Sequence, residues 1–283
     1  MSHPSDEVTL ELLREWGLPD PGESKKERGR VMVVGGSRRS PGAVLLAGEA
    51  ALRVGAGRLG LVVPASIEAR LGAVMPEAGV LSLPTHATDP IAGPLRDELR
   101  SADAVLVGPG FDDADETRAT LLAVAEAGVA VLVLDAFALG ILPGVERGLL
   151  PAALVLNPNE EEAGILLGRD LGDDRIADLR EIARRYDAVV NCYGDIATPE
   201  GTVWRVAAGG PGLGTSGSGD VLAGAITGFA ARGVDPARAA VWGSWAHATA
   251  GDRLTARTGI GFLARELPAE LSLAVADALG PPA

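Results

Sequence analysis

One stretch of the chain reads Gly209-Gly210-Pro211-Gly212-Leu213-Gly214-Thr215-Ser216-Gly217-Ser218-Gly219-Asp220. It leads directly into residues 221–231, a nearly all-apolar run that is typical of a buried helix. Glycines let the backbone approach a ligand closely, and the start of a helix presents unpaired N–H groups to an anion. The stretch therefore predicts a phosphate-binding loop in which Gly217, Ser218 and Gly219 lie nearest to the nucleotide.

Asp220 lies at the start of this predicted helix. A carboxylate there can accept the proton of a hydroxyl group while backbone amides stabilise a transferring phosphoryl group. The alternative is a flexible turn in which Asp220 is an ordinary helix cap. The stretch is not a Walker loop, because no Gly-Lys-Ser/Thr follows, and it is not a Rossmann fingerprint, because no suitable strand leads directly into it. We expect Asp220 to be catalytic.

Away from this stretch, short apolar runs alternate with longer helical patterns. Parallel strands joined by crossover helices have this signature. The predicted strands are 31–34, 59–63, 104–107, 130–134, 154–156 and 188–190, and the predicted helices are 43–54, 115–127, 160–167, 176–186 and an all-helical C-terminal third from Asp220 onward. Right-handed crossovers predict a three-layer α/β/α sandwich with a mostly parallel central sheet. We expect one domain over residues 1–283, in which residues 1–28 form a helix and a polar approach segment.

Ligands in such sheets bind beyond the carboxyl ends of the strands. Four loops with unusual residues follow predicted strands: Gly35-Gly36-Ser37, Gly108-Pro109-Gly110, Asp135 and Asn157-Pro158-Asn159. Asn159 and Glu162 are three residues apart, so both can face one ligand or a hydrated Mg²⁺ ion. The alternative is a helix N-terminus whose acidic residues favour the helix dipole.

The composition narrows the class of protein. A net charge of −13 argues against a nucleic-acid binder or an anionic-membrane binder, because polyanions are repelled at long range. Cys192 is the only cysteine, so no intrachain disulfide forms, and no basic neighbour in sequence would lower the pKa of its thiol. His247, on an apolar helix, is interpreted as a packed residue. The N-terminus lacks the pattern of a signal peptide and no apolar run reaches 18 residues, so we expect a cytoplasmic protein.

The chain resembles the ADP-dependent NAD(P)H-hydrate dehydratase family, a branch of the ribokinase-like superfamily. Residues 29–37 followed by Ser40-Pro41-Gly42-Ala43 match, as do residues 49–57, Pro76-Glu77, Gly108-Pro109-Gly110, Asp135-Ala136, the Asn157 segment, residues 214–224 and residues 247–252. The resemblance runs from about residue 25 to residue 279. Because these motifs occur in the family's order, their combination is far more specific than any one of them.

The resemblance implies a ribokinase-like fold and the repair of hydrated NADH and NADPH. ADP would phosphorylate the ring hydroxyl with Mg²⁺ as cofactor, and elimination of phosphate would restore the dinucleotide and leave AMP. By position, Ala43, Gly110, Asn159 and Asp220 would contact the hydrated nicotinamide nucleotide, with Asp220 as the base. Gly219 would contact the adenosine nucleotide, the adenine-nucleotide loop would be Asn191-Cys192-Tyr193-Gly194-Asp195, and Glu162 would bind the metal through water. A functional partner with NAD(P)H-hydrate epimerase activity is also implied.

Three positions depart from the family pattern. Phe137 stands where the family has the second Asp of Asp-Ala-Asp, Asn159 stands where it has His, and the nucleotide loop contains no Lys. Two alternatives therefore stay open: a kinase of a hydroxyethylthiazole, pyridoxal or sugar, and a catalytically silent nucleotide-binding protein. Trp242, Trp245 and Ala246 suggest an apolar surface for subunit contact, and with the resemblance they predict a homo-oligomer, a tetramer.

Overall fold

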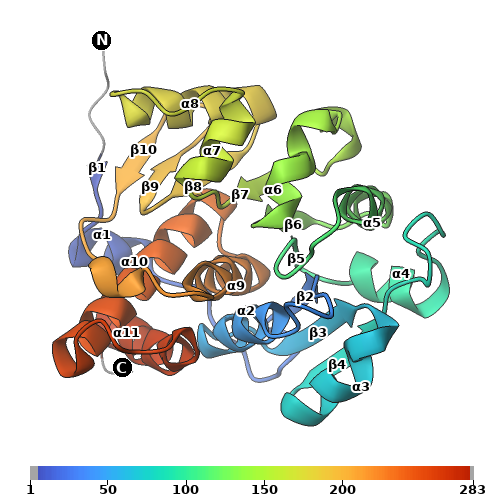
Figure 1. The fold of residues 1–283 in the computed structure, drawn as a ribbon. Helices are drawn as coiled ribbons and strands as arrows, with labels where there is room; N and C mark the ends of the chain where they lie inside the picture. Colours follow the sequence, from blue (N-terminus) through green and yellow to red (C-terminus); the bar gives the residue numbers. More distant parts are fainter. Residues whose placement is uncertain (1–5, 281–283) are drawn as a thin grey trace.

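The structure, a computed structural model, describes residues 6–280 and contains one ten-stranded sheet (Figure 1). The strands are β1 (Asp6–Glu7), β2 (Arg30–Val34), β3 (Arg58–Val63), β4 (Ala78–Ser82), β5 (Ala104–Val107), β6 (Val131–Leu134), β7 (Ala153–Leu156), β8 (Val189–Cys192), β9 (Asp195–Ala197) and β10 (Val203–Arg205). Their order across the sheet is β1-β10-β9-β8-β7-β6-β5-β2-β3-β4. All pairs from β8 to β4 are parallel, whereas β9 is antiparallel to both β8 and β10.

The direction of strand addition reverses once in the parallel part of the sheet. The chain adds β3 and β4 on one side of β2, and then returns to place β5 on the other side. From β5 it continues outward through β6, β7 and β8. The carboxyl ends of β2 and β5 therefore border the topological switch point, where open α/β sheets bind ligands.

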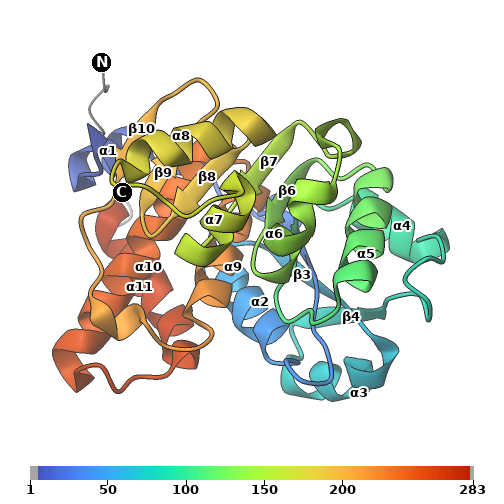
Figure 2. The same cartoon turned by 45° about the horizontal axis from the view of Figure 1, so that its top comes forward.

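Helices cover both faces of the sheet, which makes three layers (Figures 1 and 2). One face packs against α1 (Leu10–Trp16), α2 (Ala43–Arg53), α3 (Ala65–Val74), α9 (Ser218–Ala231), α10 (Pro236–Thr258) and α11 (Leu267–Leu279). The other packs against α4 (Gly93–Arg100), α5 (Ala114–Glu126), α6 (Phe137–Ile141), α7 (Glu160–Leu167) and α8 (Arg175–Tyr186). Short 3-10 helices lie at Leu142–Gly144, Arg147–Leu149, Pro211–Leu213 and Ala264–Glu266.

Each face of the sheet has its own hydrophobic core. In β2, Val31 and Val33 belong to one core, while Met32 and Val34 belong to the other. All four side chains are fully buried because helices cover both sides of the strand. This is why the central strands read as continuous apolar runs without polar alternation.

Helix α9 packs closely against α2, and this contact positions the start of α9 beside the sheet. A Cβ on Gly224 would lie 2.1 Å from the carbonyl oxygen of Ala47, so only glycine allows the approach. A similar limit holds at Gly228, where a Cβ would lie 2.7 Å from the carbonyl oxygen of Ala51. The small residues of the apolar run 221–231 thus bring two helix backbones together.

The structure confirms the predicted three-layer fold and the six predicted strands, whose ends differ from the prediction by at most two residues. The predicted helices and the all-helical C-terminal third are also present. Strands β1, β4, β9 and β10 and helices α3, α4 and α6 were not predicted. Residues 1–5 of the expected N-terminal segment lie outside the described residues, and its helix is α1.

The expectation of an apolar subunit surface on α10 is wrong for two of the three residues that suggested it. Trp242 and Ala246 are fully buried, and Trp245 packs its ring edge against Trp242 at 6.1 Å between ring centroids. Their apolar character therefore serves the core beneath the sheet. Among residues 6–280, no helix is both long and apolar enough to cross a lipid bilayer.

Candidate active site

Helix α9 starts with a sharp change of backbone direction. Gly217, its N-cap, has φ 91°, and a Cβ there would lie 2.5 Å from Cδ1 of Leu46. The left-handed conformation therefore favours glycine, and a larger residue would also displace the Leu46 side chain. Ser218, Gly219 and Asp220 form the first turn, where a helix leaves N–H groups without intrahelical acceptors.

The side chain of Ser218 is buried and points away from the open end of this turn. Its Oγ lies 2.9 Å from Nε2 of His247 on α10. Burial lowers the pKa of His247 to about 4, so this imidazole is neutral at physiological pH. His247 is thus a packed residue, as the sequence indicated, and it also holds the first turn of α9 against α10.

Two adjoining cavities meet at Asp220. The small cavity, of about 210 Å³, is lined by Asp135, Ala136, Asn157, Pro158, Asn159, Glu162, Tyr193, Gly217, Gly219, Asp220 and Leu222. The large cavity, of about 800 Å³, extends from Asp220 and Asn159 to Ala43 and Gly110. The structure therefore brings together the four residues that were predicted to contact the nicotinamide substrate. Gly217 and Gly219, two of the predicted nucleotide contacts, border the same space.

The environment of Asp220 suits it for accepting a proton. The carboxyl group is largely buried, and this desolvation raises its pKa to about 6. A base whose pKa lies near the working pH combines an ionised population with useful basicity. Asp135, on the other side of the small cavity, is buried, and its pKa is raised well above the usual value by desolvation and by the charge of Asp220.

A chain of buried side chains holds Asp135. Its Oδ1 accepts a hydrogen bond from Nδ2 of Asn157 at 2.8 Å, and Oδ1 of Asn157 accepts one from Nδ2 of Asn191 at 2.7 Å. Oδ1 of Asn191 in turn accepts from Oγ of Ser244 at 2.9 Å. This chain of hydrogen bonds links α10, β8 and the loop after β7 to the cavity. The sequence did not predict it, because its residues are far apart in the chain.

The backbone around Asp135 is strained and crowded. Ala136 has φ 50° and ψ −124°, a conformation that L residues rarely adopt. A Cβ on Gly108 would lie 1.9 Å from the carbonyl oxygen of Asp135, so only glycine fits there. Phe137, where the family pattern has Asp, lines the large cavity and is 36% exposed. It gives that wall an apolar surface in place of a charge.

Asn159 and Glu162 form a capping box at the start of α7. Oδ1 of Asn159 accepts from the backbone N–H of Glu162 at 2.8 Å, and Oε2 of Glu162 accepts from the backbone N–H of Asn159 at 2.9 Å. Both residues also line the two cavities, and burial raises the pKa of Glu162. The helix-start interpretation is therefore correct, and it leaves both residues at the site.

The predicted adenine-nucleotide loop is divided. Tyr193 lines the small cavity in the turn between β8 and β9, which continues through Gly194. Asn191 and Cys192 are buried inside β8, and the Asp195 carboxylate accepts from Nε of Arg205 at 2.7 Å. Of this loop's side chains, the structure thus brings only that of Tyr193 to the small cavity.

The residues around Asp220 fit a metal ion that arrives with phosphate. Among residues 6–280, no three His, Cys, Asp or Glu side chains form a cluster that would hold a metal ion. Glu162 and Asp220 nevertheless border one cavity. Mg²⁺ usually keeps several waters and binds through one or two carboxylates and substrate phosphates. This donor set suits such an ion and not a dedicated cage.

Comparisons with known proteins agree with this geometry. The sequence model of the NAD(P)H-hydrate dehydratase family matches residues 31–272. The chain is 46% identical to the ADP-dependent (S)-NAD(P)H-hydrate dehydratase of Xanthomonas campestris pv. campestris, over 93% of this chain and 94% of that protein. It is 33% identical to a bifunctional NAD(P)H-hydrate repair enzyme of Moorella thermoacetica, of which it spans 52%.

A solved structure with the same architecture is also similar. It is the ADP/ATP-dependent NAD(P)H-hydrate dehydratase of Bacillus subtilis, co-crystallised with ATP and Mg²⁺. The two chains have a TM-score of 0.80 and 25% identity over 95% of this chain and 97% of that one. Family match, similarity over nearly the whole length and fold agree, and the chain belongs to the NAD(P)H-hydrate dehydratase family.

Proposed function

We propose that this protein is an ADP-dependent NAD(P)H-hydrate dehydratase. The observation that carries the proposal is the position of Asp220, which lies at the start of α9 and borders both cavities. The hydroxyl oxygen of the hydrated nicotinamide ring attacks the β-phosphorus of ADP, and the bond to AMP breaks. The ring then loses phosphate and a neighbouring proton, which restores NADH or NADPH.

In this reaction Asp220 accepts the hydroxyl proton as the new P–O bond forms. The first-turn amides of α9, at Gly219 and Asp220, stabilise the negative charge on the transferring phosphoryl group. Ala43 and Gly110 border the large cavity with no bulky side chain, which leaves room for the hydrated ring next to Asp220. Asn159 and Glu162 stay bound to each other and shape the opposite wall.

The phosphate groups of ADP occupy the small cavity, between Tyr193 and the Gly217–Gly219 turn. Asn191 supports this cavity from behind, because its Nδ2 donates a hydrogen bond to Oδ1 of Asn157. Cys192 is buried in β8, and Asp195 pairs with Arg205. Glu162 would hold Mg²⁺ through water beside the ADP phosphates, and the ion would supply charge neutralisation there. The Xanthomonas relative is named as ADP-dependent and the Bacillus structure contains ATP and Mg²⁺, which supports this assignment.

A partner activity belongs to the same proposal. The chain spans about half the length of relatives named as bifunctional NAD(P)H-hydrate repair enzymes. We infer that this protein works beside an NAD(P)H-hydrate epimerase, which would convert the epimer that Asp220 does not reach. We also propose a cytoplasmic location and a homotetramer. Of the residues that suggested the tetramer, Trp242 and Ala246 are in the core and Trp245 is partly buried.

The direct test is incubation of purified protein with chemically hydrated NADH, ADP and Mg²⁺. Recovery of the reduced-nicotinamide absorbance with ADP, together with release of AMP and phosphate in equal amounts, is the expected result. A parallel reaction without nucleotide is the control. Absence of recovery, combined with phosphorylation of a sugar, pyridoxal or hydroxyethylthiazole, would replace the dehydratase with a kinase.

A further inference from the structure

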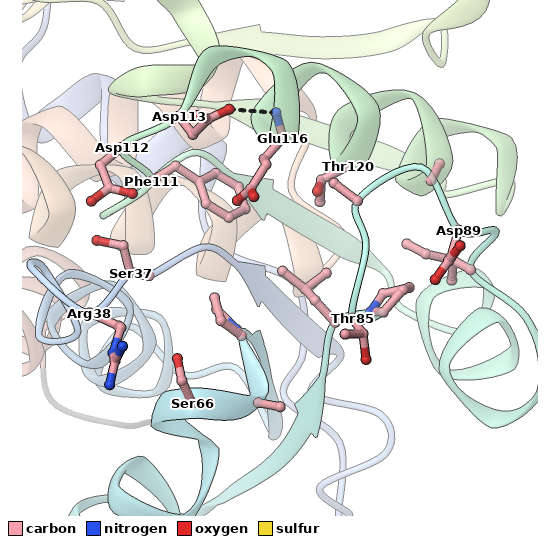
Figure 3. A pocket seen from close by; sticks show the side chains of 18 of the residues that line it. Ser37, Arg38, Ser66, Thr85, Asp89, Phe111, Asp112, Asp113, Glu116 and Thr120 are labelled. Atoms are coloured by element: carbon pink, nitrogen blue, oxygen red, sulfur yellow. Dashed lines mark hydrogen bonds between the residues drawn. The ribbon is translucent and has the colours of Figure 1, made fainter.

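A third cavity, of about 730 Å³, lies on the far side of the topological switch point from Asp220 (Figure 3). We call it the outer cavity. Its walls come from the loop after β2 (Ser37, Arg38 and Arg39), the start of α3 (Ser66), the loop after β4 (Thr85 and Asp89) and the segment before α5 (Phe111 and Asp112). None of these residues has a part in the reaction proposed above.

The outer cavity adjoins the active site. Arg39 and Phe111 line both the outer cavity and the large cavity that holds Asp220. Together, the small, large and outer cavities follow the carboxyl ends of the strands from β7 across β6, β5, β2 and β3 to β4. A single ligand can therefore extend from the reaction centre into the outer cavity.

The length of this path fits a dinucleotide. Three strand spacings separate β6, which precedes Asp135, from β3, which precedes the Ser66 wall. At about 4.8 Å each they amount to roughly 15 Å, comparable with the distance between the two bases of an extended dinucleotide. In open α/β sheets, dinucleotides cross the sheet edge at the switch point, which here lies between β2 and β5.

At the switch point, the loop after β2 carries positive charge that can bind a pyrophosphate. Arg38 and Arg39 are exposed, and neither forms an ion pair with any residue in 6–280. The loop that carries them is held in place, because Oγ of Ser37 accepts hydrogen bonds from the backbone N–H groups of Arg39 and Ser40 at 3.3 and 3.2 Å. Arginine binds phosphate oxygens in a bidentate manner.

The remainder of the outer cavity suits a nucleoside without further phosphates. Figure 3 shows Thr85 and Asp89 at the end opposite to Ser37 and Arg38. The lining of the whole outer cavity, taken over residues 6–280, contains the carboxylates of Asp89, Asp112, Asp113 and Glu116. Arg38 and Arg39 are the cations in this lining. A carboxylate binds ribose hydroxyls and repels a 2′-phosphate, while Phe111 and Leu83 supply apolar surface for a base.

We propose that the outer cavity binds the adenosine half of the dinucleotide substrate, with Arg38 and Arg39 on the pyrophosphate and a free 2′-hydroxyl on the ribose. This inference rests on the proposed function and deepens it. It gives the enzyme two separate adenine sites, one for ADP beside Tyr193 and one for the substrate beyond Phe111. It also makes NADH hydrate a better substrate than NADPH hydrate.

Filling the outer cavity tests the inference. Ser66 is exposed in the first turn of α3 and borders the cavity, so Ser66→Trp fills it without disturbing the core. Ala69→Trp is the matched control, because Ala69 is exposed on the same helix and does not line the cavity. We expect Ser66→Trp to raise KM for NADH hydrate by about tenfold or more, because base contacts and hydrogen bonds are lost. KM for ADP should not change.

A truncated substrate separates this site from the reaction centre. Hydrated reduced nicotinamide mononucleotide lacks the adenosine half, so Ser66→Trp, Ala69→Trp and the parent protein should turn it over equally. Equal KM values for NADH hydrate in Ser66→Trp and the parent would overturn the inference, and preference for NADPH hydrate would overturn the ribose assignment.

A parent protein with no activity on NADH hydrate would instead contradict the proposed function. The cavity is then judged by calorimetry with NAD⁺ and nicotinamide mononucleotide as probes. Ser66→Trp should weaken NAD⁺ binding by about tenfold and leave the binding of nicotinamide mononucleotide, which lacks the adenosine half, unchanged. Equal NAD⁺ affinity in the two proteins would contradict the inference independently of turnover.

Discussion

The carboxyl groups of Asp135 and Asp220 line one small cavity, and the charge of Asp220 raises the pKa of Asp135. Two carboxyl groups in such a space repel each other when both are charged, so one ionises at a lower pH than the other. The surroundings of each group decide which one ionises first. Asp220 is the less buried of the two and lies at a helix N-terminus, which favours its anion. We infer that Asp220 ionises first and that Asp135 stays protonated while Asp220 acts as the base.

The first prediction concerns the pH dependence of the reaction. Burial raises the pKa of Asp220 to about 6, and only the ionised form accepts a proton. The rate constant kcat/KM for NADH hydrate should therefore fall as the pH decreases through about 6, with one proton taken up. Steady-state rates between pH 5 and pH 8 check this, after correction for the acid-catalysed loss of NADH. A profile that stays flat down to pH 5 would exclude Asp220 as a base with a raised pKa.

The second prediction separates the two carboxyl groups. A protonated Asp135 has one donor group and one acceptor oxygen, as an amide has, and Asn157 already donates to it. Asp135→Asn should keep turnover within about tenfold of the parent, because at most one neutral hydrogen bond is altered. A loss as large as that of Asp220→Asn would show that Asp135 acts in its charged form.

Much of the fold was predictable because the central strands are buried on both faces. β2, β5 and β6 contain continuous apolar runs of strand length, which are typical of the inner strands of a parallel sheet. Strand β4 was missed because it lies at the edge, contains Gly79 and is only partly buried. β9 and β10 have three residues each, too few for a periodic signal.

The site was predictable where its residues lie in distinctive loops. Ala43, Gly110 and Asp220 each belong to a glycine-containing motif, and the structure brings them to one cavity. The chain of hydrogen bonds from Asn157 through Asn191 to Ser244 had no such signal, because tertiary packing alone brings these three residues together. For the same reason, the sequence did not show whether Trp242 and Ala246 are buried in the core or against another subunit.

The third prediction concerns the only cysteine. Cys192 is fully buried in β8, and burial raises the pKa of its thiol to about 11. At pH 8 its thiolate fraction is then about a hundredfold below that of an ordinary thiol. Iodoacetamide should leave the native protein unmodified and label it once in urea, as measured by intact mass. Rapid labelling of the native protein would contradict the buried position.

The fourth prediction tests the contact that positions α9. Gly224→Ala places a Cβ against the carbonyl oxygen of Ala47, so one helix must shift. Such overpacking costs about 1–3 kcal/mol of unfolding free energy, and turnover should fall as the first turn of α9 moves. Gly148→Ala is the control, since a Cβ there meets no atom within 4 Å. Urea denaturation measures both variants, and equal stability would contradict the packing argument.

The fifth prediction is that Asp220→Asn loses activity and gains stability. The amide keeps the shape of the side chain but cannot accept the hydroxyl proton, so turnover should fall by about 10²–10⁴-fold. The affinity for AMP should stay within a few fold, because the backbone amides of Gly217–Gly219 are retained. Burial raises the pKa of Asp220 from its ordinary value of 3.8 to about 6, so the charged carboxylate destabilises the folded protein. The neutral amide removes this cost, which is why the variant should be more stable.

The pH dependence of that gain has a definite sign. The buried charge costs nothing below the unfolded-state pKa, its cost grows as the pH rises from about 4 to about 6, and it is complete above that range. Asp220→Asn should therefore melt a few degrees higher than the parent at pH 8, for a gain of about 1–3 kcal/mol, and at the same temperature near pH 4. Thermal melts at the two pH values, beside turnover at pH 8, measure both halves. If Asp220 were only a helix cap, the variant would keep at least half of the parental rate and melt no higher at pH 8. That result would remove Asp220 from the mechanism.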